Sequence, residues 1–525
     1  MTRTLESWKD VARTLSEIVA THPDKCLGVL GLSYHHLPIH LKPCFLSISC
    51  FPEDFQVDTR RLIQLWIAEG FIRTSGNGKC LEEVAIDCLE DLISRNLIQA
   101  RKRRFNEAEI SKFMHVERTY PTLPAQKHNV RRFSFQTLSY SVDDCCKLLP
   151  PVARSIYLFS HLNLPLEPRP PIKLLRTLPI YDRDPIIHES FCHFKFLRVL
   201  AISHIDIKFW SFPLVITKLF HLRYLQVRFY GKIPESISEL QNLQTLICSG
   251  HPFDITLPVK IWTMKNLRYI SLGGATYLPS PRRESILNKH LVSGMPNLEE
   301  LSGLCCASCT NAVFSGIPNL KRLIIYEPFN KRNCLPNRLM DMSSLSKLEA
   351  FKCDWKPLSQ YFPIKSSVFP TSLKRLTLAG KYYFSWEDIS SIVIMLPNLE
   401  ELKLKCCRAD DDVWRLSDKD KFKSLKLLLL SNLNLKRLEA SSDNFLNLKR
   451  LVLKECNILE EIPTDFGEIC TLESIELHDC STTAEDSARK IEQEQEDMGN
   501  NFLKVYIHNS RIRNEFMVSR SMISR

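Results

Sequence analysis

The stretch Phe445–Leu453, FLNLKRLVL, decides the fold, because variants of it recur along most of the chain. Its leucines at 448, 451 and 453 lie three and then two residues apart. Successive side chains of a strand face opposite sides, so Leu451 and Leu453 point into one core while the residues between and before them point outward. We call the residue equivalent to Leu448 the leading leucine. The pattern places leading leucines at Leu197, Leu222, Leu243, Leu267, Leu298, Leu320, Leu345, Leu373, Leu399, Leu425, Leu448 and Leu472.

The leading leucines recur with a nearly constant period. Eleven steps cover 275 residues (472 minus 197), or about 25 per step, and leucine-rich repeats have roughly 20 to 29 residues. One repeat cannot bury its apolar face alone, so neighbouring repeats stack into a solenoid with a parallel sheet on its concave side. The sequence therefore predicts an α/β fold with a leucine-rich-repeat horseshoe.

Two further residue types keep fixed places in the repeat. Asparagine favours turns because its side chain bonds nearby backbone. It precedes six leading leucines, at Asn242, Asn266, Asn297, Asn319, Asn398 and Asn447. Cysteine follows the last core position by three residues, at Cys407, Cys456 and Cys480. Cysteine is among the most buried residue types, so we expect core thiols there rather than metal ligands.

Composition limits the class of protein. The amino end, MTRTLESWKDVARTLSEIV, carries charges throughout and lacks the apolar stretch of a signal peptide. No window reaches the about 18 apolar residues of a membrane helix. The 19 cysteines are therefore expected to be reduced thiols. Cys305, Cys306 and Cys309 cluster, but no second pair follows at zinc-finger spacing, so no metal is expected. The net charge of +11 is compatible with acidic proteins, anionic lipid headgroups or nucleic acid, and selects none of them.

The segment before the repeats has the pattern of a winged helix. In Leu30–Ile72 we expect helices at about 29–36, 41–47 and 59–68, with a turn at 52–54 and Gly70 ending the third helix. A helix over 81–95 and the strand LIQARKRRF, leading into a basic hairpin, complete the arrangement.

Two motifs in this segment carry a family resemblance. LSYHHLPIHLKPCFLSISCFPED (32–54) and LIQLWIAEGFI (62–72), followed by the repeats, resemble plant intracellular immune receptors of the coiled-coil NB-ARC leucine-rich-repeat family, in particular the late blight resistance group. The resemblance implies a cytoplasmic plant defence protein of innate immunity whose repeats recognise a pathogen effector or a guarded host protein and regulate the hypersensitive response. Other domains of such receptors are further expected partners. In that family the winged helix packs internally, so nucleic acid is not an expected partner.

The nucleotide switch of the family is not found in the sequence. Its phosphate loop needs Gly-x-x-x-x-Gly-Lys-Ser/Thr, and the Gly-Lys pairs at Gly78, Gly231 and Gly380 lack the other residues. Asp410–Trp414 imitates the acidic magnesium-binding strand, and Met114–Val116 imitates the Met-His-Asp motif with valine for aspartate. We therefore expect no bound cofactor, although the family binds ADP or ATP, and consider ADP binding an inherited attribute. The resemblance also suggests truncation at the amino end, which would leave Trp66 or Phe71 exposed.

These patterns divide the chain into five segments. They are a remnant helix of the nucleotide-binding region (1–26), a winged-helix domain (27–118), a junction and cap (119–150), leucine-rich repeats (151–480) and a carboxyl-terminal cap and tail (481–525). We expect residues 164–185, which are rich in proline, to be an irregular insertion. Residues 481–501 are expected to form a helix or tail, and Phe502–Ser510 a last capping strand.

The expected functional surface is the concave face, because the sequence shows no catalytic constellation and predicts no enzyme. Its outward positions combine basic and aromatic residues, which suits an acidic protein partner, and tyrosine and arginine are enriched at binding hot spots. No transmembrane segment is expected, and peripheral membrane association remains open. A ubiquitin-ligase substrate adaptor and a non-functional receptor fragment are the alternative interpretations. The predicted partner-binding residues are Arg223, Tyr224, Gln226, Arg268, Tyr269, Lys321, Arg322, Lys374, Arg375, Lys449 and Arg450.

Overall fold

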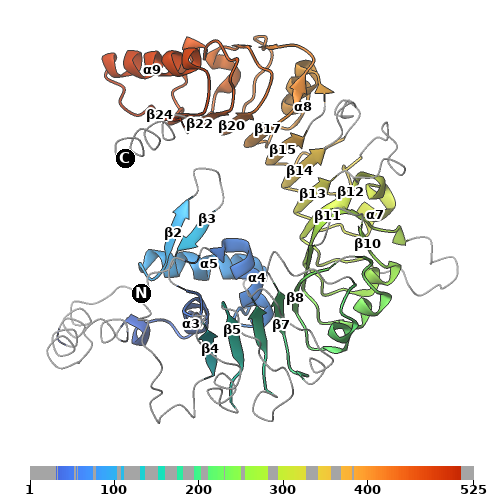
Figure 1. The fold of residues 1–525 in the computed structure, drawn as a ribbon. Coiled ribbons are helices and arrows are strands. Elements are labelled where there is room, and N and C mark those ends of the chain that lie inside the picture. The colour runs from blue at the N-terminus through green and yellow to red at the C-terminus, as the bar shows by residue number, and fades with distance from the viewer. Residues whose placement is uncertain are drawn as a thin grey trace, which may run out of the picture. The chain divides into compact units, whose positions relative to one another are not determined.

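In a computed structural model, the chain divides into two units (Figure 1). The first unit comprises residues 1–207 and 221–225, and the second unit comprises residues 208–220 and 226–525. The residues that the structure describes are 13, 31, 33–52, 55, 57–74, 78–102, 108–111, 131–135, 152–159, 174–180, 194–202, 211–229, 231–249, 255–281, 294–326, 341–355, 368–380 and 383–509.

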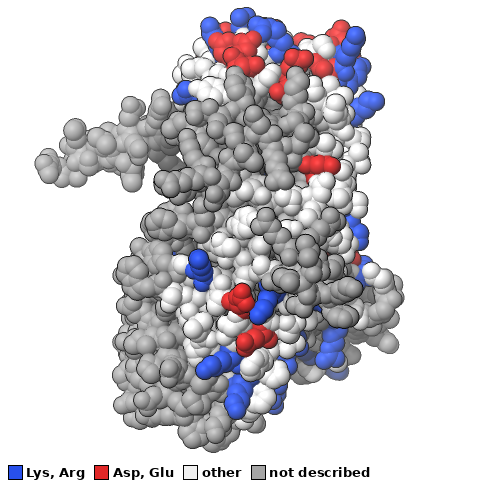
Figure 2. All heavy atoms as spheres, turned by 90° about the vertical axis from the view of Figure 1, so that its right-hand side faces the viewer, with Lys and Arg blue, Asp and Glu red and all other residues white. Residues whose placement is uncertain are grey.

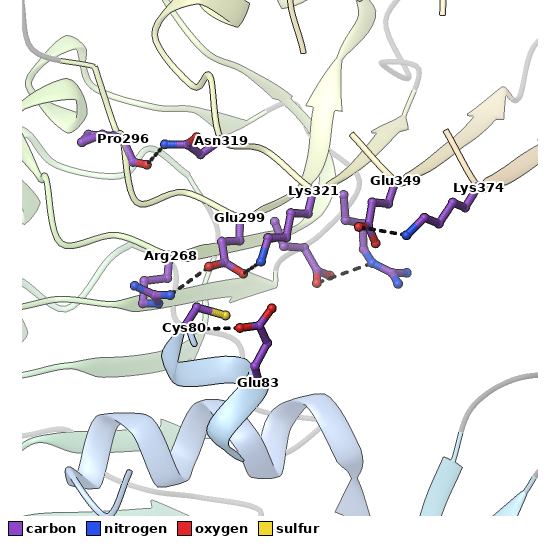
Figure 3. Close-up of polar contacts among 11 residues, drawn as sticks. Cys80, Glu83, Arg268, Pro296, Glu299, Asn319, Lys321, Glu349 and Lys374 are labelled. Carbon is purple, nitrogen blue, oxygen red and sulfur yellow. Dashed lines mark hydrogen bonds and ion pairs between the residues drawn. The ribbon is translucent and has the colours of Figure 1, made fainter. Parts of the chain in front are cut away.

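The first unit contains the predicted winged helix. Its helices are α3 (Lys42–Ile48), α4 (Thr59–Glu69) and α5 (Leu81–Ser94), and residues 31 and 33–35 are also helical. Strands β1 (Val57–Asp58), β2 (Gln99–Lys102) and β3 (Ala108–Ser111) form an antiparallel sheet in the order β1-β3-β2. The Asp58 carboxylate caps α4 by accepting from the Arg61 amide at 3.0 Å, and Gly70 ends it with a φ of 81°. The Cys80 amide donates to the Glu83 carboxylate at the start of α5 (Figure 3).

Four parallel strands share this unit with the winged helix. They are β4 (Arg132–Phe135), β5 (Ser155–Leu158), β6 (Thr177–Ile180) and β7 (Val199–Ile202). The Phe51 ring contacts the rings of Tyr157 and Phe159, with centroids 5.6 and 5.9 Å apart, and the Ser134 hydroxyl donates to the Cys50 carbonyl at 2.6 Å. The winged helix and the first repeats therefore bury their apolar side chains together.

Two predictions about the first unit were wrong. Trp66 is only 1% exposed, because α3 covers its indole, and Phe71 is half-buried beside the Arg132 guanidinium. The segment 164–185 is not wholly irregular, since it contains β6. There Leu175, Leu178 and Ile180 keep the spacing of a repeat despite the surrounding prolines.

The second unit is a stack of parallel strands that lie side by side (Figure 1). They are β9 (Thr245–Ser249), β10 (Ile255–Thr256), β11 (Tyr269–Tyr277), β12 (Glu300–Cys305), β13 (Arg322–Tyr326), β14 (Ala350–Trp355), β15 (Arg375–Gly380), β17 (Glu401–Lys405), β20 (Leu427–Ser431), β22 (Arg450–Lys454), β23 (Ser474–His478) and β24 (Lys504–His508). Strand β8 (Tyr224–Arg228) crosses the division between the units. As predicted, the alternate residues Leu451 and Leu453 are buried, and so are their equivalents in neighbouring strands.

The return segments of the repeats are short helices and strands. Four 3₁₀ helices directly follow a proline, whose fixed φ suits the start of a helix: η4 (Leu214–Lys218), η5 (Glu235–Glu239), η6 (Val259–Thr263) and η11 (Thr464–Glu468). The others are η8 (Cys306–Ser308), η10 (Ser442–Phe445), α7 (Asn311–Ser315) and α8 (Trp386–Met395). Short parallel pairs join β16 (Tyr383–Phe384) to β18 (Arg408–Ala409), and β19 (Val413–Arg415) to β21 (Arg437–Glu439).

The carboxyl-terminal predictions are confirmed. Helix α9 (Thr482–Asp497) buries Ala484, Ala488 and Ile491, and β24 pairs with β23 as a capping strand.

One leading leucine was placed three residues too early. The Glu349 and Ala350 amides both donate to the Lys321 carbonyl, as the Lys449 and Arg450 amides donate to Lys426, so Leu348 and not Leu345 is equivalent to Leu448. The segment MSSLSKLEAF allows either choice because it repeats the three-residue spacing.

The asparagines and cysteines link neighbouring repeats. The side-chain amide of Asn447 donates to the Lys423 carbonyl at 2.7 Å, and that of Asn319 to the Pro296 carbonyl at 2.8 Å (Figure 3). The predicted partner was nearby backbone, but all six reach the preceding repeat, 22 to 32 residues away. Cys407 and Cys456 are buried as predicted, and their thiols donate to the Leu378 and Leu430 carbonyls of neighbouring strands. Cys480 is half-buried.

Candidate protein-binding face

The residue immediately before each strand of the parallel stack forms a row, which we call the leading row. In the second unit, from β11 to β23, its charged residues mostly alternate in sign. They are Arg268, Glu299, Lys321, Glu349, Lys374, Glu400, Lys426, Lys449 and Glu473. The regular stacking of repeats places each side chain beside its equivalents in the next repeats, so opposite charges meet.

Ion pairs connect the leading row from repeat to repeat. Glu299 accepts from Arg268 at 2.9 Å and lies 3.2 Å from the Lys321 ammonium, and Lys374 pairs with Glu349 at 3.3 Å (Figure 3). The pairs Lys426–Glu400 and Lys449–Glu473 have distances of 2.9 and 2.8 Å. Four of the basic residues that we predicted as partner contacts are therefore neutralised by acids of neighbouring repeats: Arg268, Lys321, Lys374 and Lys449.

The first residues of the strands form a second, more buried row. Arg322 lies 3.6 Å from Glu300, and Arg450 donates to Glu476 at 2.7 Å. The Glu476 side chain is only 5% exposed. The Arg375 Nε is buried without a hydrogen-bond partner among the described residues.

The aromatic part of the predicted stripe is not exposed. Tyr224 is 1% exposed, and Gln226 and Tyr269 are 8% exposed. The alternation of strand side chains does place them opposite the leucine core, but that position does not by itself expose them.

Basic and aromatic side chains also lie at the carboxyl ends of the last strands. Burial lowers the pKa of Lys454, and the neighbouring charge of Lys405 lowers it further. The His478 and His508 rings stack with centroids 4.7 Å apart, and Tyr506 is 39% exposed.

Two family models match this chain, one in the winged-helix part and one in the repeats. A family model described as the disease resistance protein winged helix domain matches residues 50–116, and one described as a leucine-rich repeat region matches residues 175–489, which is more than half of the chain. The chain belongs to the disease-resistance family of leucine-rich-repeat proteins.

Curated relatives in this disease-resistance family are longer than this chain. Late blight resistance protein homolog R1B-16 of Solanum demissum is 31% identical over 528 residues, which cover 97% of this chain and 39% of the relative. Homolog R1B-8 of the same species is 30% identical over 531 residues, with 97% and 42% covered. The chain thus spans about two fifths of the length of these relatives.

Among solved structures, one similar protein is a plant peptide hormone receptor in complex with its peptide. The alignment covers 69% of this chain and 64% of that receptor, at 17% identity and with a TM-score of 0.37.

The segments that imitate the family's nucleotide motifs form turns and core contacts in this structure. Gly78, Gly231 and Gly380 have φ values of 74°, 100° and 117°, which are turn conformations that favour glycine. The Asp411 carboxylate accepts from Arg415 at 2.7 Å and from the Val413 amide, so it closes a local turn. Trp414 of the same segment is buried against Trp386, with ring centroids 4.6 Å apart. Residues 114–116 lie outside the described residues.

Sequence reasoning about this chain missed several charged residues. Glu349, Lys426 and Glu473 occupy leading-row positions. Each directly follows a leading leucine, and this position in the repeat could have identified them from the sequence. The Cys309 thiol, which we weighed as a metal ligand, donates to the Cys305 carbonyl at 3.7 Å. The described helices include none long and apolar enough to span a lipid bilayer.

Proposed function

We propose that this chain is a cytoplasmic, non-enzymatic recognition module of plant defence. Its repeats bind a pathogen effector or a guarded host protein and thereby regulate the hypersensitive response. The observation that carries this proposal is the leading row of the second unit, where charges alternate from repeat to repeat. A surface of mixed sign suits a protein with a complementary pattern better than a uniformly charged polymer, because complementary charges set specificity and suppress wrong partners. On the face that Figure 2 shows, described acidic and basic side chains also lie close together in several places.

Nucleic acid is not proposed as a partner of the winged helix. In DNA-binding helix-turn-helix proteins a recognition helix presents its side chains to the major groove. Here α4 has seven consecutive buried residues, Leu62–Ala68. The burial of this stretch supports the internal packing expected from the family.

We also propose that the described part of the chain holds no ADP or ATP by a phosphate loop. The support is the sequence, in which no Gly-Lys pair has the required neighbours, together with the turn geometry of those glycines. Calorimetric titration of the full chain with ADP is expected to give no saturable heat. A micromolar Kd would overturn this part of the proposal.

Exchanging one ion pair tests the protein-binding role. Late blight effectors would be co-expressed with the full chain in Solanum leaves, and co-precipitation and cell death would be scored. The double variant Glu349→Lys with Lys374→Glu keeps the pair but inverts its sign on the surface, at sites that are about 40 to 50% exposed. We expect loss of at least one effector interaction without loss of protein level. The matched control exchanges Lys490 and Glu494 on α9, which lie 3.8 Å apart. Equal binding by wild type and the Glu349/Lys374 exchange would contradict a role for this row.

A further inference from the structure

Two cysteines lie opposite each other just beyond the ends of β22 and β23. The two strands pair in parallel, with Lys454 opposite His478. Cys456 and Cys480 each follow two residues later, so successive repeats place a thiol at the same position. In the repeat before them, Leu433 holds that position. The repeat therefore accepts leucine there, and in its last two copies it brings two thiols together instead.

Backbone hydrogen bonds hold this cysteine pair on both sides. Glu455 and Asp479 directly precede the two cysteines with φ values of 51° and 50°, so both chains make the same turn. The Glu455 amide donates to the His478 carbonyl at 2.8 Å, and the Ser481 amide donates to the Cys456 carbonyl at 3.2 Å. These bonds continue the strand spacing of about 4.8 Å past the ends of the strands. A disulfide needs Cα atoms about 4.4 to 6.8 Å apart, so it fits this backbone.

The two thiols interact with each other and differ in their access to solvent. The hydrogen bond between them lowers the pKa of the Cys480 thiol against the opposing effect of burial, and together with burial it raises the pKa of Cys456. Cys456 is 0% exposed, whereas Cys480 is half-buried. The thiolate is the reactive form of cysteine, so Cys480 is the thiol that reacts first with a small oxidant from solution. Cys456 is then in place to attack the oxidised sulfur.

We propose that a hydroperoxide converts Cys456 and Cys480 into a disulfide, and that this crosslink fixes the carboxyl-terminal cap of the repeats. The Cys480 thiolate attacks one peroxide oxygen, the O–O bond breaks, and a sulfenic acid forms while hydroxide leaves and takes up a proton. The Cys456 sulfur then attacks the Cys480 sulfur and the S–O bond breaks. The Cys456 proton goes to the departing hydroxide. Over both steps, two thiols and one peroxide give one disulfide and two waters.

The crosslink would strengthen an existing attachment of the cap. Ser481, directly after Cys480, caps α9 by accepting from the Ala484 amide at 3.3 Å, and its hydroxyl donates to the Leu459 carbonyl. The two cysteines are 24 positions apart (480 minus 456), and β23 lies in the loop between them. Closing such a loop covalently disfavours open states of the last repeat. The pair lies beyond the carboxyl ends of the strands, whereas the leading row precedes the strands, so this inference does not depend on the proposed function.

Peroxide oxidation of the full, reduced chain tests the proposal. After treatment with hydrogen peroxide under native conditions, free thiols are blocked with iodoacetamide in denaturant, and the chain is digested with a protease that cleaves after glutamate. Glu460 and Glu476 lie between the two cysteines, so digestion separates their peptides unless a disulfide joins them. We expect mass spectrometry to detect the Cys456 peptide joined to the Cys480 peptide, and dithiothreitol to separate the two.

Cys470 provides a competitor within the same chain. It is exposed and lies 10 positions before Cys480 (480 minus 470), against 24 for Cys456. Shorter loops close more readily in an unfolded chain, so oxidation in urea should favour the Cys470–Cys480 disulfide, and the folded chain should favour Cys456–Cys480. The proposal is overturned if the folded chain keeps both thiols free, if it joins Cys470 to Cys480 in greater yield, or if folded and unfolded chains give the same products.

Three variants separate the roles of the thiols. Cys470→Ser is the matched control and should form the Cys456–Cys480 disulfide as wild type does. Cys480→Ser should leave Cys456 free after peroxide treatment. Cys456→Ser should stop at the Cys480 sulfenic acid, which dimedone traps. Circular dichroism of each variant confirms that it is folded, and the wild-type measurement decides the proposal if a variant is not.

Hydrogen exchange tests the effect on the cap. In the crosslinked chain the amides of β23 should exchange at least about tenfold more slowly than in the reduced chain, because opening of the last repeat is restricted. The amides of β13, which belongs to an earlier repeat, should exchange equally in both forms. Equal exchange of β23 in the two forms would overturn the claim that the disulfide fixes the cap.

Discussion

The indole nitrogen of Trp66 donates a hydrogen bond to the Ser47 hydroxyl at 2.7 Å, and this contact joins α4 to α3 inside the winged helix. Both side chains are buried. The bond links two residues that are 19 positions apart in sequence and belong to different helices. Removing this bond therefore tests whether the winged helix is a packed domain in this chain.

Ser47→Ala should destabilise the first unit by about 1–3 kcal/mol, because the buried indole N–H loses its partner. Urea unfolding followed by tryptophan fluorescence measures the change. Ser94→Ala is the control, since Ser94 is exposed and its hydroxyl bonds only to Asp91 one turn earlier. The control should change the stability by less than about 0.5 kcal/mol. Equal effects of both variants would contradict the packing of α3 on α4.

Arg450→Met should cost about 3 kcal/mol or more, because it leaves the Glu476 carboxylate buried without its 2.7 Å partner. Lys449→Met removes the neighbouring pair with Glu473, which is half-exposed, and should cost less than about 1 kcal/mol. Chemical denaturation of both variants measures the difference. Adding Glu476→Gln to Arg450→Met should recover part of the loss, and no recovery would show that the two side chains do not interact.

The sequence was sufficient to predict the core of the repeats but not all of their register. A core position needs only an apolar residue at the right spacing, and Leu451 and Leu453 satisfy this rule. Leu345 and Leu348 satisfy the same spacing, so only backbone hydrogen bonding to the Lys321 carbonyl decides between them. The β6 strand was missed because its prolines obscured an otherwise regular repeat.

The candidate face was less predictable because it depends on neighbours in other repeats. Lys374 was predicted to contact a protein partner, but it pairs with Glu349, which lies 25 residues earlier and one repeat away. Tyr224 was assigned to the outward side from strand alternation, which gives the side of the sheet and not what covers it.

Cysteine alkylation should distinguish exposed from core thiols. Cys406 and Cys470 are exposed, whereas burial raises the pKa of Cys248, and the Cys480 thiol together with burial raises that of Cys456. The thiolate is the reacting form, so raising the pH from about 7 to 9 should speed labelling of the exposed pair and leave Cys248 and Cys456 unlabelled. Iodoacetamide treatment of the native chain, followed by peptide mass spectrometry, measures this. Rapid native labelling of Cys456 would contradict the core position of the repeat cysteines.

Gly303→Ala should destabilise the second unit by about 3 kcal/mol or more. Gly303 has a φ of 98°, and an added Cβ would lie 2.4 Å from the Leu272 carbonyl oxygen. The position lies in the register shift between β11 and β12, so relief of the clash requires these strands to separate. Gly274→Ala is the matched control, because Gly274 belongs to the same irregularity, has no positive φ, and an added Cβ would meet no atom within 4 Å. Thermal melting of the two variants measures the contrast. If Gly303→Ala melts at the wild-type temperature, the strands do not approach as closely as this bulge requires, and the register on either side of it is wrong.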